Sequence, residues 1–457
     1  MIPFISILLL CVVFFVSPGE SGGVLASIRY FLGNELGSYY LLMGLGIFLC
    51  SLYIAFSKYG TICLGEEAKP QYSSFQWGSM MFTAGLAADI LFYSLCEWIL
   101  YAGEPRIAQM GEMQDWASTY PLFHWGPIPW SFYMVLAVAF GFMLHVRKRN
   151  KQKYSEACRP LLGSHVDGFL GKLIDLTAVF ALLAGTATTF SLATPLLSAT
   201  ISQVFGLTQN HLLTIFILMI ICITYTVTVY FGMKGVSKLA ASCSYLFFTL
   251  LAYVLIGGGE ARYTIETGIT AIGNLAQNFI GLSTWSDSLR TSSFPQNWTI
   301  FYWAYWMVWC VATPFFICSI SKGRTIRQTI LGGYFYGLAG TFTSFIILGN
   351  YGLHLQVSGK FDLMGLYEKT GDLYQVILSV MDTLPFAKAG LILLAITMIA
   401  FYATSFDALT MVAATYSYKE LSSEMEPHKN VKLFWAILLM LLPIVLIFSD
   451  SSMANLQ

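Results

Sequence analysis

Long apolar runs alternate with short polar links along the whole chain. Most runs approach 20 residues, the length that an α-helix needs to cross the hydrocarbon core of a bilayer. The pattern therefore predicts an all-α integral membrane protein of eleven spans with no soluble domain. The spans are expected at residues 2–17, 38–57, 76–102, 128–146, 170–197, 211–232, 244–258, 298–319, 329–352, 387–414 and 433–449.

The composition agrees with this prediction. Of the 457 residues, 56% are hydrophobic and 11% are charged, whereas about 25% of the residues in a soluble domain carry a charge. The formal net charge of +0 argues against nucleic acid as a partner. Lys and Arg gather in the links on the same side of the membrane as the N-terminus, above all in RKRNKQK (147–153). Because basic residues are enriched in cytoplasmic links, this distribution predicts a protein of the cell membrane whose N-terminus lies in the cytoplasm.

The first run, MIPFISILLLCVVFFV, has two interpretations. It is short and is followed by small residues, as a signal peptide would be. It lacks the basic residues that begin a signal peptide, and this absence favours a true first helix.

The link between the seventh and eighth spans, residues 259–297, differs from the others because it is amphipathic. Ile265, Ile269, Ile272 and Leu275 recur at helical spacing. We expect this helix to lie flat on the outer surface and to connect two groups of spans.

Two spans contain small, helix-weakening residues: the third holds FTAGLAADILF (82–92) and the fifth holds LLAGTATTFSLATP. Irregular backbone at membrane depth is tolerated only where it faces protein or a water-filled cavity, and interrupted helices point to the binding site of a transporter. Close packing through small residues is the alternative, and it stays open for the fifth span. In the third span the buried charge of Asp89 favours a functional site over a structural ion pair.

Aromatic side chains crowd the eighth span in FYWAYWMVWC. With 3.6 residues per turn, Tyr302, Tyr305, Trp306 and Trp309 share one face of a helix. An interfacial belt of rings explains Tyr302 and its neighbour Phe301. Trp306 and Trp309 lie deeper, so they either pack as core or line a cavity.

A second aromatic cluster, LFHWGPIPWSFY (122–133), supports the cavity. It places Trp125, Trp130 and Tyr133 at a Gly-Pro-rich entry into the fourth span, where a regular helix cannot continue. Two such clusters suggest the walls of one box. Aromatic rings attract a cation that has no hydrogen bonds to offer, and quaternary ammonium compounds are the ligands that such boxes recognise.

The motif WTIFYWAYWMVWCVATPFFICSISKGRTIRQ (298–328) closely resembles the signature of the betaine/choline/carnitine transporter family. LFHWGPIPW, FGMKGVSKLA (231–240) and TSFDA (404–408) fit further motifs of that family in order. The resemblance implies one transporter domain with a LeuT-type five-plus-five inverted repeat: two peripheral spans in residues 1–75, the first repeat in 76–258, the outer linker in 259–297 and the second repeat in 298–457. A family member inserts a twelfth span where this sequence stops at SDSSMANLQ, so the second repeat is expected to be incomplete.

The resemblance also implies which residues form the substrate site and that the site carries a negative charge. The ammonium box would consist of Trp125, Tyr305, Trp306 and Trp309, with Trp130 and Tyr133 nearby. Asp89 would face the ammonium, at a position where betaine carriers of the family tend to have glycine. An aspartate repels the carboxylate of betaine or carnitine and complements choline, whose only charge is positive. It could also bind a coupling proton.

Two further groups follow from the resemblance. Thr404 and Ser405, opposite Thr83 and Leu86, resemble a sodium site, although hydroxyls at these places also satisfy helix backbone. Lys322, Arg324 and Arg327 would form ion pairs at a cytoplasmic gate, and the enrichment of positive charge inside the cell explains them almost as well.

We therefore expect a secondary transporter that imports a quaternary ammonium compound, most of all choline, by sodium- or proton-coupled alternating access. The alternatives are a carnitine or betaine symporter or exchanger of the same fold, and a non-transporting sensor or defective paralogue. An enzyme is not expected, because no nucleophile and base or metal-ligand spacing accompanies the proposed cavity. No cofactor is expected beyond the coupling ion, and the resemblance implies a homotrimer in the lipid bilayer.

Overall fold

A computed structural model describes residues 9, 12–13, 16–66, 69–230, 233–422 and 425–448. Within these residues the chain is built of helices, and its only extended pairing is an isolated bridge between Cys63 and Thr325. This confirms the predicted all-α class. Most of the predicted first span lies outside the described residues. The end of the chain, where a twelfth span was expected to be missing, also lies outside them.

The helices follow the predicted spans from the second onward. The first half of the chain contains α2 (Pro18–Tyr30), α3 (Gly37–Phe56), α4 (Ser74–Ala84), α5 (Ala88–Ala102), α6 (Pro105–Met110), α7 (Met113–His124), α8 (Pro127–Gly141), α9 (Tyr154–Ala157), α10 (Arg159–Leu162), α11 (Phe169–Phe205) and α12 (His211–Tyr230). The second half contains α13 (Met233–Gly257), α14 (Ala261–Thr284), α15 (Ile300–Val308), α16 (Ala312–Ile320), α17 (Ile326–Gly332), α18 (Leu338–Ser344), α19 (Asn350–Val357), α20 (Leu363–Thr370), α21 (Leu373–Asp382), α22 (Ala387–Thr415) and α23 (Lys429–Phe448). Helices α2 and α7 occupy segments for which no span was predicted.

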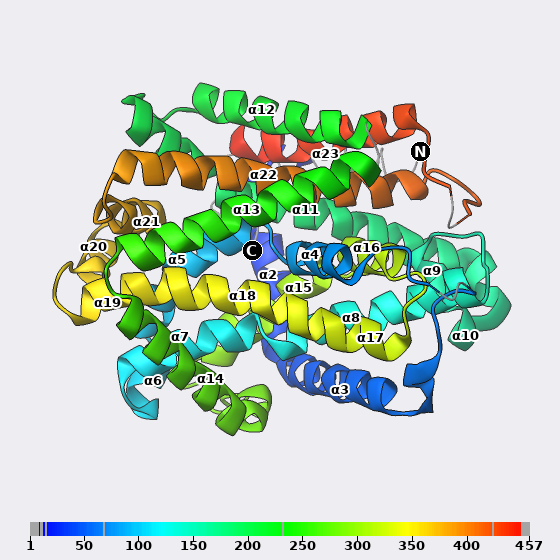
Figure 1. Cartoon of the computed structure of the whole chain (residues 1–457), viewed down its shortest axis with the longest axis horizontal. Helices are drawn as coiled ribbons and strands as arrows, with labels where there is room; N and C mark the ends of the chain where they lie inside the picture. Colours follow the sequence, from blue (N-terminus) through cyan, green and yellow to red (C-terminus); the bar gives the residue numbers. More distant parts are fainter. Residues whose placement is uncertain are drawn as a thin grey trace.

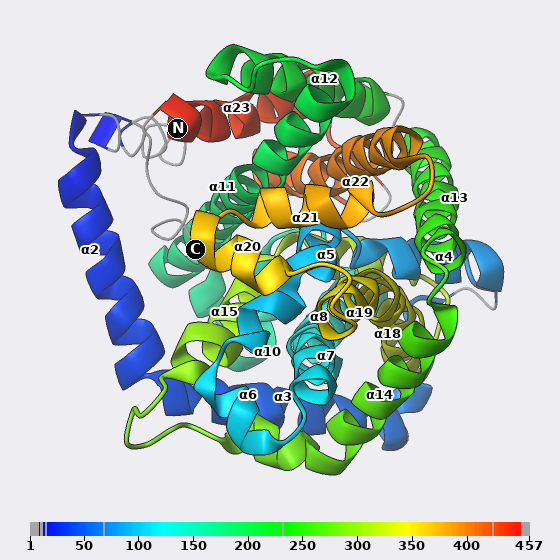
Figure 2. The same cartoon turned by 90° about the vertical axis from the view of Figure 1, so that its left-hand side faces the viewer.

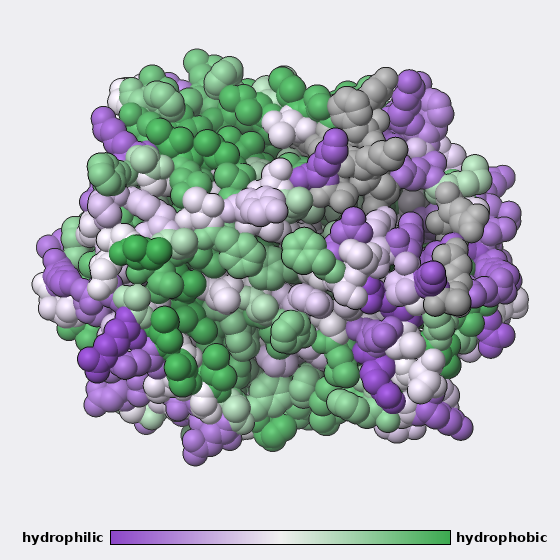
Figure 3. All heavy atoms as spheres, viewed as in Figure 1, coloured by the Kyte–Doolittle hydropathy of each residue, from purple (hydrophilic) through white to green (hydrophobic). Residues whose placement is uncertain are grey.

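The surface has the character of a membrane protein. Among the described residues, 6 helices are long and apolar enough to cross a membrane, or up to 8 if each of two bent pairs is one span. Apolar residues cover the middle of the face in Figure 3, and hydrophilic residues gather at its left and right ends. This is the pattern of a bundle whose long axis crosses a bilayer, with a polar surface at each side.

The bundle has two distinct ends. Figure 1 shows the long helices running between an end that carries α6, α20 and α21 and an end that carries α9, α10 and the start of α17. The latter, which we call the basic end, includes the RKRNKQK link. Helix α2 stands at the edge of the bundle in Figure 2, and α14 runs around its lower side.

Two bent helix pairs mark the middle of the bundle. Helices α4 and α5 meet at a 60° bend across residues 85–87, and α15 and α16 meet at a 57° bend across residues 309–311. The first break confirms the prediction for the third span. The fifth span is different, because α11 continues from Phe169 to Phe205 through its small residues and through Pro195. The small residues of α11 therefore serve packing, and the break in the eighth span was not predicted.

Helix α14 is amphipathic as predicted, but three of its isoleucines face outward. Ile265, Ile269 and Ile272 are exposed, whereas Leu275 is buried together with the small residues of the opposite face. An outward apolar stripe suits a helix that contacts lipid, where small residues allow close packing on the protein side.

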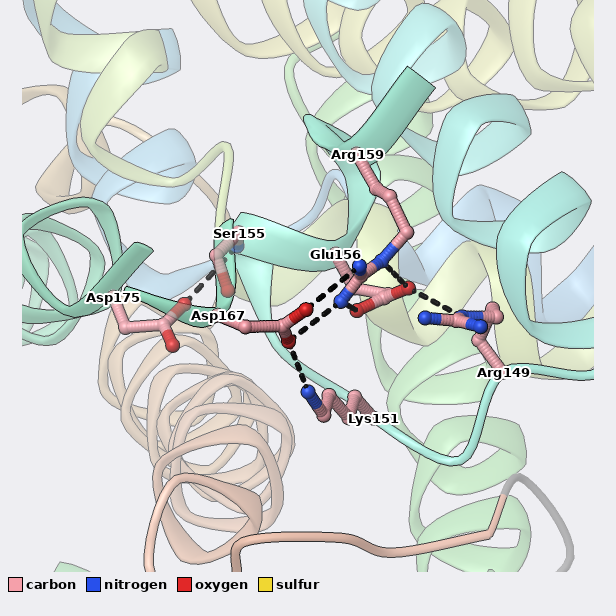
Figure 4. A network of polar contacts seen from close by, with 7 residues as sticks. All are labelled: Arg149, Lys151, Ser155, Glu156, Arg159, Asp167 and Asp175. Atoms are coloured by element: carbon pink, nitrogen blue, oxygen red, sulfur yellow. Dashed lines mark hydrogen bonds and ion pairs between the residues drawn. The ribbon is translucent and has the colours of Figure 1, made fainter. Parts of the chain in front are cut away.

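A network of ion pairs joins residues of the connection between α8 and α11 to one another (Figure 4). The Arg159 guanidinium donates to both carboxylate oxygens of Glu156, at 2.6 and 2.9 Å, and to both of Asp167, at 2.9 and 2.8 Å. Arg149 Nε donates to Glu156 Oε1 at 2.8 Å, and Lys151 Nζ donates to Asp167 Oδ1 at 2.5 Å. Two basic residues of RKRNKQK, Arg149 and Lys151, are thus paired with acids that lie further along the connection between α8 and α11.

This network predicts a pH-dependent contribution to stability. Hydrogen bonds from Arg159 and Lys151 hold the pKa of Asp167 well below its ordinary value. Burial acts to raise the pKa of Glu156, but the hydrogen bonds from Arg159 and Arg149 outweigh it and lower the pKa. Because both folded-state values are depressed, the stabilisation is fully present above the ordinary carboxyl pKa of about 4 and is lost as the pH falls through the folded-state values.

The measurement is thermal unfolding of the protein in lipid nanodiscs between pH 7 and pH 3. We expect Arg159→Met to lower the unfolding temperature at neutral pH, and we expect the difference from the wild type to shrink as the pH falls below about 4. Arg262→Met is the control, because its pair with Glu266 is exposed and contributes little. A difference for Arg159→Met that is constant across this pH range would contradict the prediction.

Candidate functional site

A cavity of about 70 Å³ lies between the two bent helix pairs. It takes residues from both breaks and from α7–α8, α13 and α22. Its walls include Thr83, Gly85, Asp89, Trp125, Tyr133, Tyr305, Trp306, Trp309, Thr313, Phe316, Thr404, Ser405 and Ala408. Six of the seven predicted substrate residues line it, and the seventh, Trp130, lies directly behind. A cavity this small admits only a small ligand, since typical ligand pockets measure about 300–1,000 Å³.

The aromatic walls come from helix segments that are far apart in sequence. The Trp306 ring centroid lies 5.6 Å from that of Trp125 and 4.9 Å from that of Tyr133. The Trp125 and Tyr305 rings are 6.2 Å apart. Trp125 sits where α7 ends and α8 has not yet begun, at the Gly-Pro-rich entry that the sequence predicted to be irregular. The two aromatic clusters therefore meet as walls of one box.

Trp130 holds the box from behind. Its ring is fully buried and lies 5.8 Å from the Trp306 ring. A Cβ atom on Gly85 would lie 2.2 Å from Trp130 Cζ2, and one on Gly337 would lie 2.5 Å from Trp130 Cη2. Only glycine at these two positions lets the indole lie between the α4–α5 break and the helix that contains Gly337, so Trp130 fixes the position of Trp306.

Trp309 lies at the second break, where α15 has ended. It lines the cavity and is 8% exposed. A Cβ atom on Gly185 of α11 would lie 3.2 Å from Val308 Cγ1, which is a tight contact, and 3.5 Å from Trp309 Cε2. The small residues of the fifth span thus let α11 approach the aromatic stripe closely, which is the packing role that the sequence left open.

Asp89 is the charged residue of the cavity. It lies in the first turn of α5, directly after the α4–α5 break, and it is 2% exposed. The Tyr305 hydroxyl donates a hydrogen bond to Asp89 Oδ2, and the Ile90 amide donates to Asp89 Oδ1 at 3.1 Å. The positive end of the α5 dipole also favours a negative charge here. Asp89 and Tyr305 therefore act as a pair, which the sequence did not predict.

The predicted sodium ligands come together only in part. Thr83, Thr404 and Ser405 line the cavity, whereas the side chain of Leu86 is buried beside it. Thr83 Oγ1 donates to the Ser79 carbonyl at 3.1 Å, and Thr404 Oγ1 donates to the Phe401 carbonyl at 2.9 Å. A hydroxyl that donates to the backbone keeps its lone pairs available as acceptors, and the sodium site stays a prediction.

The predicted gate residues lie at the basic end, outside this cavity. Arg324 stacks on Trp77, with its Cζ atom 4.1 Å from the ring centroid, and Arg327 Nε donates to the Ala55 carbonyl at 2.8 Å. Neither meets a carboxylate among the described residues. Lys322 lines a second cavity, of about 320 Å³. Ion pairs at a gate stay a prediction.

Glu97 is not among the predicted site residues, but the structure connects it to the box. Trp125 Nε1 donates to Glu97 Oε2 at 2.7 Å, and the Tyr101 hydroxyl donates to Glu97 Oε1 at 2.5 Å. Tyr101 also contacts His124 Nδ1 at 2.7 Å. These bonds hold the Trp125 indole in place. The sequence signal that could have identified Glu97 is that it is a second acid in the same span, two turns after Asp89.

Tyr302 corrects another expectation. The sequence placed this ring in an interfacial belt, but it is 0% exposed. Its centroid lies 5.6 Å from the Trp125 ring and 5.1 Å from the His124 ring. Tyr302 therefore packs behind the box, on a helix of which six of the nine residues are buried.

An apolar bundle with bent helices around a small cavity is the architecture of a membrane transporter. The chain matches the family described as "BCCT, betaine/carnitine/choline family transporter" over residues 1–457. It belongs to the betaine/carnitine/choline transporter family. The members of this family are multi-pass membrane proteins that transport small molecules, and they are transporters rather than enzymes.

Individual relatives agree with this membership. The glycine betaine transporter OpuD of Bacillus subtilis (strain 168) is 30% identical over 455 residues, which cover 97% of this chain and 86% of the relative. The carnitine transporter of Acinetobacter baumannii is 26% identical, with 88% and 74% covered. The uncharacterized transporter YeaV of Escherichia coli (strain K12) is 28% identical, with 89% and 85% covered.

Proposed function

We propose that this protein imports a small quaternary ammonium compound, with choline as the preferred substrate. The observation that carries the proposal is the carboxylate of Asp89 in the wall of a cavity lined by Trp125, Tyr305, Trp306 and Trp309. The rings hold the methylated ammonium through cation–π contacts, and the carboxylate neutralises its charge. Choline brings no negative charge of its own, so it suits a wall that already contains one.

Betaine or carnitine is the second candidate, favoured by the printed functions of two relatives. Both compounds carry a carboxylate, which Asp89 would repel if it entered the same part of the cavity. Direct comparison of the three substrates separates the candidates.

We propose that transport follows alternating access in a LeuT-type five-plus-five inverted repeat. In this arrangement α4–α5 and α15–α16 are equivalent broken helices of the two repeats, one in residues 76–258 and the other in 298–457. The two bends around one cavity support this assignment. The basic end would face the cytoplasm, with the N-terminus on the same side, and the proposal keeps the homotrimer that the family resemblance implies.

We propose that an ion gradient drives uptake. The hydroxyls of Thr83, Thr404 and Ser405 offer oxygens to sodium, and Asp89 offers a group that a proton could occupy. Thr404→Ala would remove one of the sodium ligands without touching the aromatic box.

The test is uptake of labelled choline, betaine and carnitine into proteoliposomes with the sodium and proton gradients imposed separately. We expect choline to accumulate above its outside concentration under at least one gradient, to exceed betaine and carnitine, and to stop accumulating when both gradients are dissipated. Accumulation that needs only an opposing substrate would instead show exchange. Choline binding without uptake under any gradient would favour a sensor or a defective paralogue.

A further inference from the structure

A second cavity, of about 320 Å³, opens between α16, α22 and the link before α23. Its walls include Tyr72, His145, Phe315, Phe316, Lys322, Asp407, Ala408, Met411, Met425 and Glu426. Phe316 and Ala408 line both cavities, so one wall separates them. Because α22 runs from the α21 end toward the basic end (Figure 1), the second cavity lies between the aromatic box and the proposed cytoplasmic side.

Asp407 is the unexplained group of this cavity. Its side chain is 0% exposed, and among the described residues neither carboxylate oxygen has a hydrogen-bond partner. His145 Nδ1, on the wall of the same cavity, also has no hydrogen-bond partner among the described residues. A buried carboxylate with no donor costs several kcal/mol unless a cation compensates it. The other acid of the wall, Glu426, meets Lys432, with Nζ 3.0 Å from Oε2. Lys432 also acts on Asp407 through its charge, but it makes no hydrogen bond to the Asp407 carboxylate.

The walls favour an organic cation over a metal ion. Among the described residues, no group of three or more His, Cys, Asp or Glu side chains is placed to hold a metal ion. The cavity walls to which Asp407 belongs include the rings of Tyr72, Phe315 and Phe316 and the thioether of Met411, beside the polar side chains of Gln71, Gln152, Ser319, Lys322 and Glu426. Aromatic and thioether surfaces with one carboxylate accept a methylated ammonium, which is apolar outside and charged within.

We propose that this cavity is a second, weaker site for the transported ammonium compound, in which Asp407 holds the cation on its way between the aromatic box and the cytoplasm. This inference rests on the proposed function. The ammonium compound that leaves Asp89 in the first cavity binds next to Asp407 in the second. Phe316, which lines both cavities, separates the two positions. Two negative charges along one path keep the ammonium from crossing an apolar segment uncompensated.

Equilibrium binding of labelled choline to the protein in nanodiscs tests the second site. We expect two classes of site in the wild type. Asp407→Asn should weaken the second class about tenfold or more and spare the first, whereas Trp306→Ala should do the reverse. Met411→Lys provides an independent variant, because it places an ammonium one turn from Asp407 on the cavity wall. Thr410→Val is the matched control on the same helix and should leave both classes unchanged.

The outcomes separate this inference from the proposed function. A single class of site in the wild type, lost in Trp306→Ala, would overturn the second site and leave the transporter proposal standing. Two classes that persist in both Asp407→Asn and Met411→Lys would also overturn the role of Asp407. Absence of choline binding to the wild type would overturn the proposed function, and the second site with it.

Discussion

Replacing Trp306 by alanine is expected to weaken choline binding about thirtyfold or more. Trp306 contacts three other rings of the site, those of Trp125, Trp130 and Tyr133, so its removal opens the centre of the box. A desolvated cation–π contact contributes about 2 kcal/mol or more, which corresponds to that loss of affinity. Equilibrium binding to the protein in nanodiscs measures the effect, and Trp306→Phe should retain part of the affinity because it keeps a ring.

The control for this prediction is a second buried indole. Trp98 is 2% exposed, close to the 3% of Trp306, but it does not line the cavity. Trp98→Ala therefore creates a similar packing defect without removing a wall of the box. If both alanine variants fold and lose choline affinity equally, the loss reports stability, and the assignment of the box to the ammonium is wrong.

The fold was predictable where a helix is long and apolar. Each predicted span from residue 38 onward has a helix at its place, because bilayer-length apolar runs leave few alternatives. Helix α7 was missed because Met113–His124 mixes polar and apolar residues and joins the fourth span through the irregular backbone at Trp125. The break at residues 309–311 was missed because WCVATP contains no glycine, and its only proline lies after the bend.

The site was predictable as a set of residue types, but its pairings were not. Charge within a span singled out Asp89, and ring spacing singled out Trp306. The hydrogen bond from Tyr305 to Asp89 depends on how two bent helices cross, and no local pattern encodes that crossing. Asp407 went unnoticed within the TSFDA motif for the same reason, since only the packed structure shows that its carboxylate is buried without a partner.

Replacing Asp89 by glycine is expected to exchange the substrate preference of the transporter. The variant removes the negative charge that attracts choline, and it frees the Tyr305 hydroxyl, which now donates to Asp89, to donate to a substrate carboxylate. Choline uptake should fall, and betaine uptake should rise relative to it, by on the order of tenfold to a hundredfold in their ratio. Glycine is tolerable here because Asp89 lies in the first turn of α5, next to an existing break.

Competition between labelled choline and betaine in proteoliposomes measures this ratio directly. Asp89→Asn separates charge from shape, because it keeps the size of the side chain and a carbonyl oxygen that can accept from Tyr305. If charge decides the preference, Asn and Gly should both lose choline uptake, and only the Gly variant should gain betaine, since only there is the Tyr305 hydroxyl released. An Asp89→Gly protein with full choline uptake would show that the ammonium is held by the rings alone, and the choline preference would then need another cause.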